Sequence, residues 1–332
     1  MKLLIITQSV DVNDPVLGFF HNWLKKFSAK FDHITVICLF TGEHNLPSNI
    51  KVLSLGKEDG LSKIKYTLRL FKYIWNERAN YEKVFVHMNQ EYVLLGKPLW
   101  YLLGKEIFFW RNHRQGNWLT RLAVYFSTKV FCTSPDSYTA RFKKAILMPV
   151  GVDTDFFHPP HNNKREGGSV FMLGRISPVK RVDLFIEALI GLKNLGLDFK
   201  AYIIGSPANE KDQVYAQKLR QMAIPILNSG HLIFIPAVNQ EEARDFFQSK
   251  DVYVNLTPTG SMDKTIFEAM ACEAVTVVDN SDNIRHFENK LEQALNTVEE
   301  TKANLRKSNR EKVVAEHSLK LLVDKLSNTI TN

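Results

Sequence analysis

Two successive series of short apolar runs constrain this chain more than any other feature of its sequence. Within each series, the runs are separated by longer segments in which apolar residues recur at helical spacing. Short runs rich in Val, Ile and Phe are typical of parallel strands covered by helices on both faces. The sequence therefore predicts an α/β protein with two doubly wound parallel sheets. The runs are residues 3–7, 34–39, 84–87, 107–110, 130–133 and 146–150, then 170–173, 200–204, 232–235, 252–256 and 275–278.

A polar segment between the two series marks the expected domain boundary. It contains Pro159 and Pro160 followed by HNNKREGG, a composition typical of linkers. We therefore expect an N-terminal domain over residues 1–158 and a second domain over residues 159–309, since 332 residues exceed what one core usually organises. Residues 310–332 predict a C-terminal amphipathic helix whose apolar stripe suits packing back on the N-terminal domain.

Cysteine usage and hydropathy predict a cytoplasmic protein without a structural metal. The three cysteines lie far apart and have neither a disulfide-framework nor a zinc-site spacing. The N-terminal stretch MKLLIITQSV is too short for the apolar region of a signal peptide with its cleavage site. No apolar run approaches the ~20 residues that span a bilayer.

The net charge of +8 is confined to the first half of the chain. Residues 1–158 hold 21 Lys and Arg against 13 Asp and Glu, whereas residues 159–332 hold 22 of each. Basic surfaces attract nucleic acid, anionic lipid or acidic substrates. We expect no nucleic-acid partner, because no motif for one is present. An anionic membrane surface is a candidate partner of the N-terminal domain, which would make the protein peripheral on the inner face of the membrane.

Residues 60–78 carry part of this charge on a predicted amphipathic helix. Its apolar residues recur at helical spacing, and its basic residues lie mostly elsewhere around the axis. We expect the apolar stripe to pack against the domain core, while the basic face is solvated or rests on anionic lipid. The stripe consists of Leu61, Ile64, Leu68, Phe71 and Trp75.

The stretch MLGRISPVKRVDLFIEAL contains the first candidate binding site. A predicted strand ends at Gly174, and a helix begins after Pro178. Arg175 and Lys180 bracket the loop between them, where their charges can neutralise a diphosphate next to a helix N-terminus. An isolated Arg or Lys on a loop is usually just solvated. The order of strand, Gly-Arg, loop, Lys and helix favours a binding role.

The stretch NLTPTGSMDKTIFEAMACEAVTVV contains the second candidate. A predicted strand runs into a polar turn with Gly260 and Ser261, and a helix starts near Asp263 or Lys264. The amides of such a turn and helix start form an anion site. Glu268, one to two turns into the helix, can accept hydrogen bonds from the vicinal diol of a ribose. The alternative is an ordinary surface glutamate.

Together these stretches resemble glycosyltransferases of the GT-B fold, specifically the retaining family 4 of the glycosyltransferase group 1 type. In that family a GR-xxxx-K segment binds the donor diphosphate, which corresponds here to Gly174 through Lys180. A Glu-x7-Glu segment ends in EAMA, which begins here at Glu268, and GVDTDFF at residues 151–157 is similar to an interdomain loop. The resemblance covers nearly the whole chain and implies two Rossmann-like domains that face a central cleft.

The resemblance implies further site residues in the N-terminal half. Family members have a glycine-containing loop near the donor phosphates after the first strand, and Gly18 is the match here. A histidine that lies beside the donor sugar in relatives matches His113, with His87 as a weaker candidate. Either histidine can instead be a buried one satisfied by its neighbours.

Two positions depart from the family pattern. The first Glu of the family pair falls at Gly260, where Asp263 and Lys264 offer replacement polar contacts. Glu273 occupies a position where relatives usually have glycine. These departures leave open a catalytically inactive GT-B protein that binds a ligand or a partner. A nicotinamide dehydrogenase is disfavoured, because no GxGxxG follows the first strand.

The preferred hypothesis is a retaining glycosyltransferase that needs no metal or other cofactor. It moves a sugar from a nucleotide-sugar donor to a hydroxyl of a glycan or lipid-linked acceptor. The expected catalytic residues are Arg175, Lys180 and His113. The expected donor-binding residues are Gly18, Gly174, Gly260, Ser261, Asp263, Lys264 and Glu268.

Overall fold

The computed structural model describes residues 1–14, 16–162, 164–258, 263–281 and 283–332. The chain forms two compact units. The N-terminal unit combines Met1–Gly151 with Leu319–Asn332, and the C-terminal unit comprises residues 152–258 and 263–318. Each unit is an α/β fold with one parallel sheet, as the alternating sequence pattern predicts.

The N-terminal unit is built on a seven-stranded parallel sheet in the order β3-β2-β1-β4-β5-β6-β7. The pattern of apolar runs does not predict β3, an edge strand with little burial. The strands are β1 (Lys2–Val10), β2 (His33–Thr41), β3 (Ile50–Ser54), β4 (Lys83–His87), β5 (Glu106–Trp110), β6 (Lys129–Cys132) and β7 (Ala145–Leu147).

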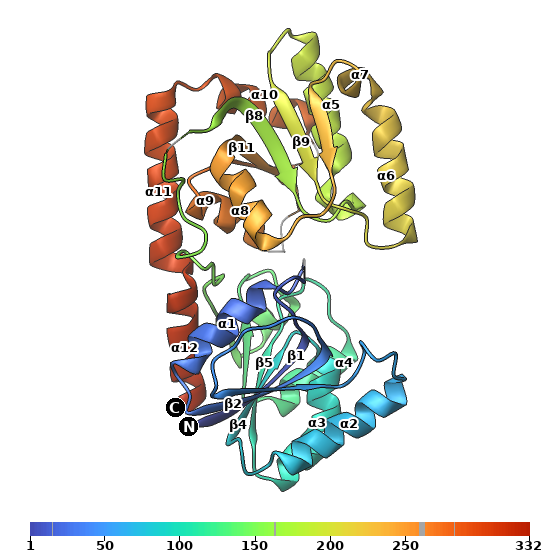
Figure 1. Cartoon of the computed structure of the whole chain (residues 1–332), viewed down its shortest axis with the longest axis vertical. Helices are drawn as coiled ribbons and strands as arrows, with labels where there is room; N and C mark the ends of the chain where they lie inside the picture. The colour runs from blue at the N-terminus through green and yellow to red at the C-terminus, as the bar shows by residue number, and fades with distance from the viewer. Residues whose placement is uncertain (15, 163, 259–262, 282) are drawn as a thin grey trace. The chain divides into compact units, whose positions relative to one another are not determined.

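Helices cover both faces of this sheet (Figure 1). Because neighbouring residues of a strand point to opposite faces, Leu3 and Ile5 of β1 enter one core, and Leu4 and Ile6 enter the other. Helices α1 (Phe19–Ser28) and α12 (Leu319–Thr331) close the first core. Helices α2 (Lys63–Asn76), α3 (Gln90–Leu102) and α4 (Trp118–Phe126) close the second, and the 3-10 helix η1 (Tyr138–Arg141) lies beside β6 and β7.

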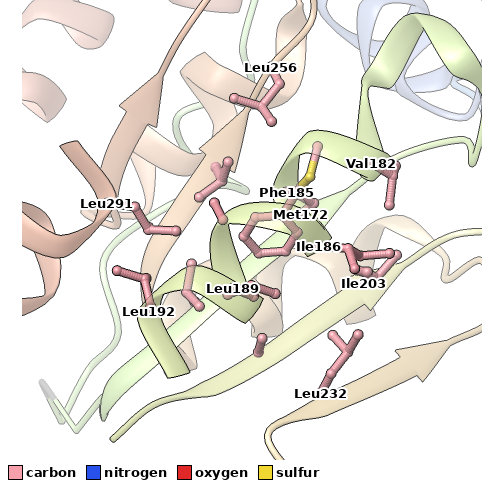
Figure 2. Close-up of a cluster of buried hydrophobic side chains, with 14 of the residues drawn as sticks. Met172, Val182, Phe185, Ile186, Leu189, Leu192, Ile203, Leu232, Leu256 and Leu291 are labelled. Carbon is pink, nitrogen blue, oxygen red and sulfur yellow. The ribbon is translucent and has the colours of Figure 1, made fainter. Parts of the chain in front are cut away.

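The C-terminal unit has a five-stranded parallel sheet in the order β10-β9-β8-β11-β12. Its main core is largely aliphatic, and Figure 2 shows Phe185 and Leu189 of α5 gathered with Met172 and Ile203 of the strands. The strands are β8 (Glu166–Leu173), β9 (Lys200–Ile204), β10 (Leu232–Ile235), β11 (Lys250–Asn255) and β12 (Val275–Val278). The helices are η2 (Pro178–Lys180), α5 (Val182–Asn194), α6 (Glu210–Met222), α7 (Ile224–Leu227), α8 (Gln240–Ser249), α9 (Lys264–Ala271), α10 (Ile284–Asn296) and α11 (Glu299–His317).

The first unit ends at residue 151, seven residues before the boundary expected at residues 158 and 159. The reason is that the expected linker packs within the C-terminal unit. The Val152 N–H donates to the His317 carbonyl at 2.9 Å. The rings of Phe157 and Phe247 lie 6.2 Å apart, edge to face. Composition marks a polar connection but does not show which unit the connection packs on.

The terminal amphipathic helix also differs from the expected single helix over residues 310–332. The chain forms α11 from residue 299, is extended at Ser318, and then forms α12. Val313 is buried in the C-terminal unit, whereas Leu322 and Leu326 of α12 enter the core beside α1. One apparent apolar stripe therefore belongs to two different units.

Helix α2 buries a different face from the one expected. Its buried residues are Leu70 and Ile74, which enter the core below α2 and α3. Three of the five side chains expected in the core are exposed instead, with Ile64 at 74%, Leu68 at 62% and Trp75 at 48%, while Leu61 and Phe71 are partly buried. The helix has apolar residues on two faces. The more regular apolar repeat in the sequence belongs to the face that points to solvent.

Two general features of the described residues complete the fold. In the part of the chain that the structure describes, no helix combines the length and the apolar character needed to cross a membrane. The three cysteines are free, and each is buried.

Candidate functional site

The loop after β8 is held in place by backbone contacts that require glycine. Gly174 has a φ of 144°, a conformation that residues with a side chain avoid. Its N–H donates to the Ile204 carbonyl at 3.0 Å. A Cβ atom on Gly205, which follows β9, would collide with the Gly174 carbonyl oxygen. The loops after β8 and β9 are thus joined at the carboxyl edge of the sheet, where doubly wound folds bind ligands.

Lys180 reaches from this loop to the start of α9. It ends η2, and a Cβ atom on Gly174 would lie 3.4 Å from its Cε, so the lysine stem runs close over the glycine. Its ammonium donates to the Asp263 carboxylate. The structure therefore joins the two candidate stretches, which the sequence separates by 83 positions.

Asp263 is fixed by further donors from β11 and α9. Its Oδ2 accepts hydrogen bonds from Asn255 Nδ2 at 2.9 Å and Thr257 Oγ1 at 3.2 Å. Its Oδ1 accepts from the Thr265 N–H at 3.3 Å, so Asp263 also caps the N-terminus of α9. Its carboxylate is therefore the centre of a small polar network.

This network keeps the Asp263 carboxylate ionised. Burial by itself would raise the pKa of Asp263, but the charge of Lys180 and the donated hydrogen bonds outweigh burial and lower the pKa. An ionised Asp263 orients the ammonium of Lys180 and balances part of its charge. Lys180 is consequently a positioned cation, in contrast to a solvated surface lysine.

Arg175 lies in the same loop and is more accessible. Its side chain is 54% exposed, and its Nε lies 3.8 Å from Asp212 Oδ2. A guanidinium held this loosely can turn toward an anion. Beside it, a pocket of about 370 Å³ opens between the loops after β9 and β10 and helix α6, with Ile176 in its wall.

Lys264 and Glu268 face each other one turn apart on α9, with Nζ and Oε1 separated by 3.8 Å. Burial raises the pKa of Glu268, with Asp263 adding to the increase and Lys264 opposing it. Burial also lowers the pKa of Lys264, which the charges of Glu268 and Asp153 oppose. Since 3.8 Å is too long for a hydrogen bond, the Glu268 carboxylate retains acceptor capacity for a ligand.

Two predicted residues of the same stretch, Gly260 and Ser261, lie outside the described residues. The structure does explain Glu273, where relatives usually have glycine. Its φ is +58°, and it directly follows Cys272, the C-cap of α9. Helices commonly end on glycine in this left-handed conformation. The departure at Glu273 thus concerns how the helix ends.

His113 lies on the loop between β5 and α4 of the N-terminal unit and is exposed. Its Nδ1 lies 3.0 Å from both the N–H and the carbonyl oxygen of Gln115, so this nitrogen holds the ring against the loop. Asn112 orders the loop, because its Oδ1 accepts from the N–H groups of Thr133 and Ser134, both at 3.2 Å. The sequence analysis does not identify Asn112.

The other two N-terminal candidates have clear packing roles. Gly18 precedes α1, and a Cβ atom there would lie 2.7 Å from the Asp14 carbonyl oxygen, so only glycine fits. His87 is buried at the end of β4, stacks on Phe20 with ring centroids 4.2 Å apart, and shares a 3.1 Å hydrogen bond with Thr7 Oγ1.

The sequence analysis also misses the residues that support Asp263. Asn255 and Thr257 carry a detectable signal, because they are polar residues where a buried strand ends. Among the described residues, no group of three or more His, Cys, Asp or Glu side chains is placed to hold a metal ion. Arg175, Lys180 and Lys264 carry positive charge at the site.

The sequence of residues 153–327, more than half of the chain, matches the family Glycosyl transferases group 1. The chain therefore belongs to this family and is a glycosyltransferase. The matched segment contains the polar network on α9 and the loop after β8. Among proteins of curated function, no sequence matches this chain significantly.

Solved structures show the same fold at low sequence identity. HepE from Anabaena, in complex with UDP, has a TM-score of 0.78 and 14% identity over 100% of both chains. Sucrose-phosphate synthase from Thermosynechococcus elongatus has a TM-score of 0.77 and 12% identity, covering 99% of this chain and 98% of its own. WaaG, a glycosyltransferase involved in lipopolysaccharide biosynthesis, has a TM-score of 0.66 and 14% identity over 99% of this chain and 100% of its own. The chain has the GT-B fold, as predicted.

Proposed function

We propose that this glycosyltransferase takes its sugar from a nucleotide-diphosphate donor bound at the carboxyl edge of the C-terminal sheet. The observation that carries the proposal is the joined pair of loops in which Lys180 is oriented by Asp263 and Arg175 is exposed beside it. Two cations on one loop suit the charge of a diphosphate. The similarity to HepE in its UDP complex supports a nucleotide donor.

In this proposal Glu268 holds the ribose. Its carboxylate lies on α9, the helix that Asp263 caps, and has acceptor capacity beyond its 3.8 Å approach to Lys264. A vicinal diol can donate two hydrogen bonds to a carboxylate. The 370 Å³ pocket beside Ile176 offers room for the nucleobase. Donor binding would then involve three loops of one sheet edge.

The proposed transfer retains the configuration at the sugar carbon and needs no metal. The bond from the anomeric carbon to the diphosphate breaks, and negative charge grows on the leaving diphosphate, where Arg175 and Lys180 stabilise it. The acceptor hydroxyl forms the new bond from the same face, and its proton passes to the departing phosphate oxygen. We propose His113 as the residue that orients the sugar.

We propose a hydroxyl of a glycan or lipid-linked molecule as the acceptor. The similarity to WaaG, which is involved in lipopolysaccharide biosynthesis, supports this class. An acceptor of this kind is found at a membrane surface, so we also propose peripheral attachment to an anionic membrane through the N-terminal unit. The excess of Lys and Arg in that half of the sequence supports the attachment.

Replacing the two site cations tests the donor site. We expect Arg175→Ala and Lys180→Ala each to lower turnover at least ~100-fold, the loss typical of removing one group that stabilises transition-state charge. The matched control is Lys211→Ala, which removes an exposed lysine of α6 in the same unit. The nucleotide sugar is chosen by thermal stabilisation of the wild type. Turnover near that of the wild type in both site variants would refute the proposed donor site.

A further inference from the structure

The outer face of α2 carries a continuous stripe of exposed apolar side chains. Ile64, Leu68 and Trp75 are exposed, although residues of these types are usually buried. At about 100° per residue, the three lie within about 40° of one another around the helix axis. The stripe thus runs along the helix for three turns. Scattered exposed apolar residues are ordinary, but an aligned set on one helix indicates a contact surface.

Lysines line one side of this stripe. Lys65 and Lys72 project within about a further 60° around the axis, on the flank away from the buried Leu70 and Ile74. Both lysines are exposed. Arg69 is excluded from this set, because its guanidinium lies 3.5 Å from the Asp59 carboxylate. We call Ile64, Leu68, Trp75, Lys65 and Lys72 the outer face of α2.

The types of residue on the outer face identify what covers it. A protein partner that buried the stripe would also desolvate the flanking lysines, which are depleted from the centres of protein interfaces. At a bilayer surface the same arrangement is favourable, because the apolar side chains enter the headgroup boundary while the lysine stems extend toward lipid phosphates. Trp75 is of the residue type that concentrates at this boundary. Anionic lipid matches the positive charge.

The neighbouring helices α3 and α4 also expose large apolar side chains. Helix α3 packs against both α2 and α4, and all three close one face of the N-terminal sheet (Figure 1). Tyr101 and Leu102 at the end of α3, and Trp118 and Tyr125 on α4, are each at least 70% exposed. Described residues of the C-terminal unit include no Trp, Tyr or Phe among their exposed large apolar side chains. The aromatic exposure is specific to the N-terminal unit.

We propose that the outer face of α2 docks the enzyme onto an anionic bilayer, with Ile64, Leu68 and Trp75 inserted at the headgroup boundary and Lys65 and Lys72 on lipid phosphates. This inference deepens the proposed membrane attachment by naming the surface and by adding an apolar contribution to the electrostatic one. Sugar transfer in solution does not depend on it. Membrane binding should thus combine two contributions. Salt weakens the electrostatic contribution of the lysines but not the apolar contribution of the inserted side chains.

Vesicle flotation with the full chain tests the apolar part. With vesicles of phosphatidylcholine and phosphatidylserine, we expect Ile64→Ser with Leu68→Ser to weaken binding roughly tenfold or more, at low and high salt alike. The matched control is Leu195→Ser with Val214→Ser, which removes two exposed apolar residues of the C-terminal unit and should bind as the wild type does. Equal binding by both double variants would overturn the proposal.

The lysines are tested in the same assay. Lys65→Gln with Lys72→Gln should weaken binding about 30-fold at low salt, at about 1 kcal/mol per basic residue near an anionic surface, and little at high salt. Lys211→Gln with Lys218→Gln on α6 should have no effect. Equal binding of the wild type to vesicles of phosphatidylcholine alone would overturn the role of charge.

Tryptophan quenching locates the contact. Lipids brominated on their acyl chains should quench part of the wild-type fluorescence, and Trp75→Phe should remove that part. Trp118→Phe is the control: it changes a more exposed tryptophan, on α4 and outside the outer face of α2, and should leave that part of the quenching in place. Quenching that survives Trp75→Phe would place the contact elsewhere.

Two measurements in the absence of lipid distinguish membrane docking from dimer formation and from a failure of the proposed transfer. If α2 instead covers a second copy of the chain, sedimentation velocity will show a dimer that Leu68→Ser dissociates, and the proposal is wrong. Turnover with a soluble acceptor, or donor hydrolysis, should be unchanged in the α2 variants. Loss of vesicle binding with intact turnover supports docking, whereas absent turnover in the wild type is a failure of the proposed function alone.

Discussion

The two units share one architecture but place their charged residues differently. Residues 1–151 and 319–332 hold 23 Lys and Arg against 12 Asp and Glu, whereas residues 152–318 hold 20 against 23. Among the described residues, Glu77 is the one buried Asp, Glu, Lys or Arg of the N-terminal unit. The buried ones of the C-terminal unit are Asp212, Asp251, Glu268, Asp279, Lys302 and Arg306.

This difference corresponds to two uses of charge. Exposed charge acts over a distance of about 8 Å at physiological salt and is weakened by added ions. Buried charge acts by contact, and each group must have a partner because desolvation is costly. The N-terminal unit suits attraction to a surface, and the C-terminal unit suits the fixed geometry of a binding site.

Asp251 should be essential to the stability of the C-terminal unit. It pairs with Lys302 at 2.7 Å and with Arg306, and all three side chains are buried, so they tie α11 to β11. Asp251→Ala removes the one buried carboxylate that Lys302 and Arg306 share, although Arg306 keeps its ion pair with the exposed Glu299, and it should lower the free energy of unfolding by about 3–5 kcal/mol. Glu77→Ala should cost about 1 kcal/mol, because its partner Lys51 is half-exposed.

The position of the tryptophans allows this comparison to be made unit by unit. All five are in the N-terminal unit, so tryptophan fluorescence follows that unit while circular dichroism follows both. In urea, Asp251→Ala should shift the circular-dichroism transition more than the fluorescence transition. Similar free-energy losses in the Asp251 and Glu77 variants would remove the contrast between the units.

Glu268 should make donor binding depend on pH but little on salt. Its pKa is raised by burial, so its carboxylate takes up a proton at a higher pH than an exposed glutamate does. Donor affinity should therefore fall as the pH is lowered from neutral, at a higher pH than for an exposed glutamate. Glu268→Gln should bind the donor tenfold or more weakly at neutral pH, since a hydrogen bond to a charged group contributes ~1.5–3 kcal/mol. Calorimetry across this range should find the pH slope absent from the variant.

Glu273 should be replaceable by glycine with a gain in stability. Its left-handed φ of +58° is unfavourable for a residue with a side chain by roughly 1–2 kcal/mol. We expect Glu273→Gly to stabilise the C-terminal unit by about 1 kcal/mol, or about 2–4 °C in Tm, and to leave turnover unchanged. Glu273→Ala is the control, since it removes the carboxylate but keeps the strain. An equal gain from alanine would assign the effect to charge.

Chelation should have the smallest effect. If Arg175 and Lys180 supply the positive charge for the leaving diphosphate, EDTA should not change the rate of transfer. A rate that EDTA abolishes and a divalent ion restores would contradict this use of the two cations.

Local sequence patterns were enough to predict the fold class and one side of the site. The periodicity of apolar runs depends on neighbours a few residues apart, so it shows strands and helices without knowledge of the whole fold. The Gly-Arg motif and the EAMA segment are likewise local. They place Arg175 after a strand, Lys180 before a helix and Glu268 within a helix, where the structure has them.

The arrangement of these elements depended on contacts between distant segments. The pairing of Lys180 with Asp263 spans 83 residues and gives Asp263 a role that its own stretch does not indicate. Helix α2 has two apolar faces, and only packing against α3 selects Leu70 and Ile74 for the core. The break at Ser318 divides one apparent stripe between two units.

The sequence by itself determined which elements form and which residue types lie at their ends, because those properties follow from short-range periodicity and chemistry. The tertiary structure decided which apolar face is buried and which charges are paired. Local energies differ little between the alternative buried faces and between the alternative charge pairs. Only the packing of the complete core and the pairing of every buried charge select among them.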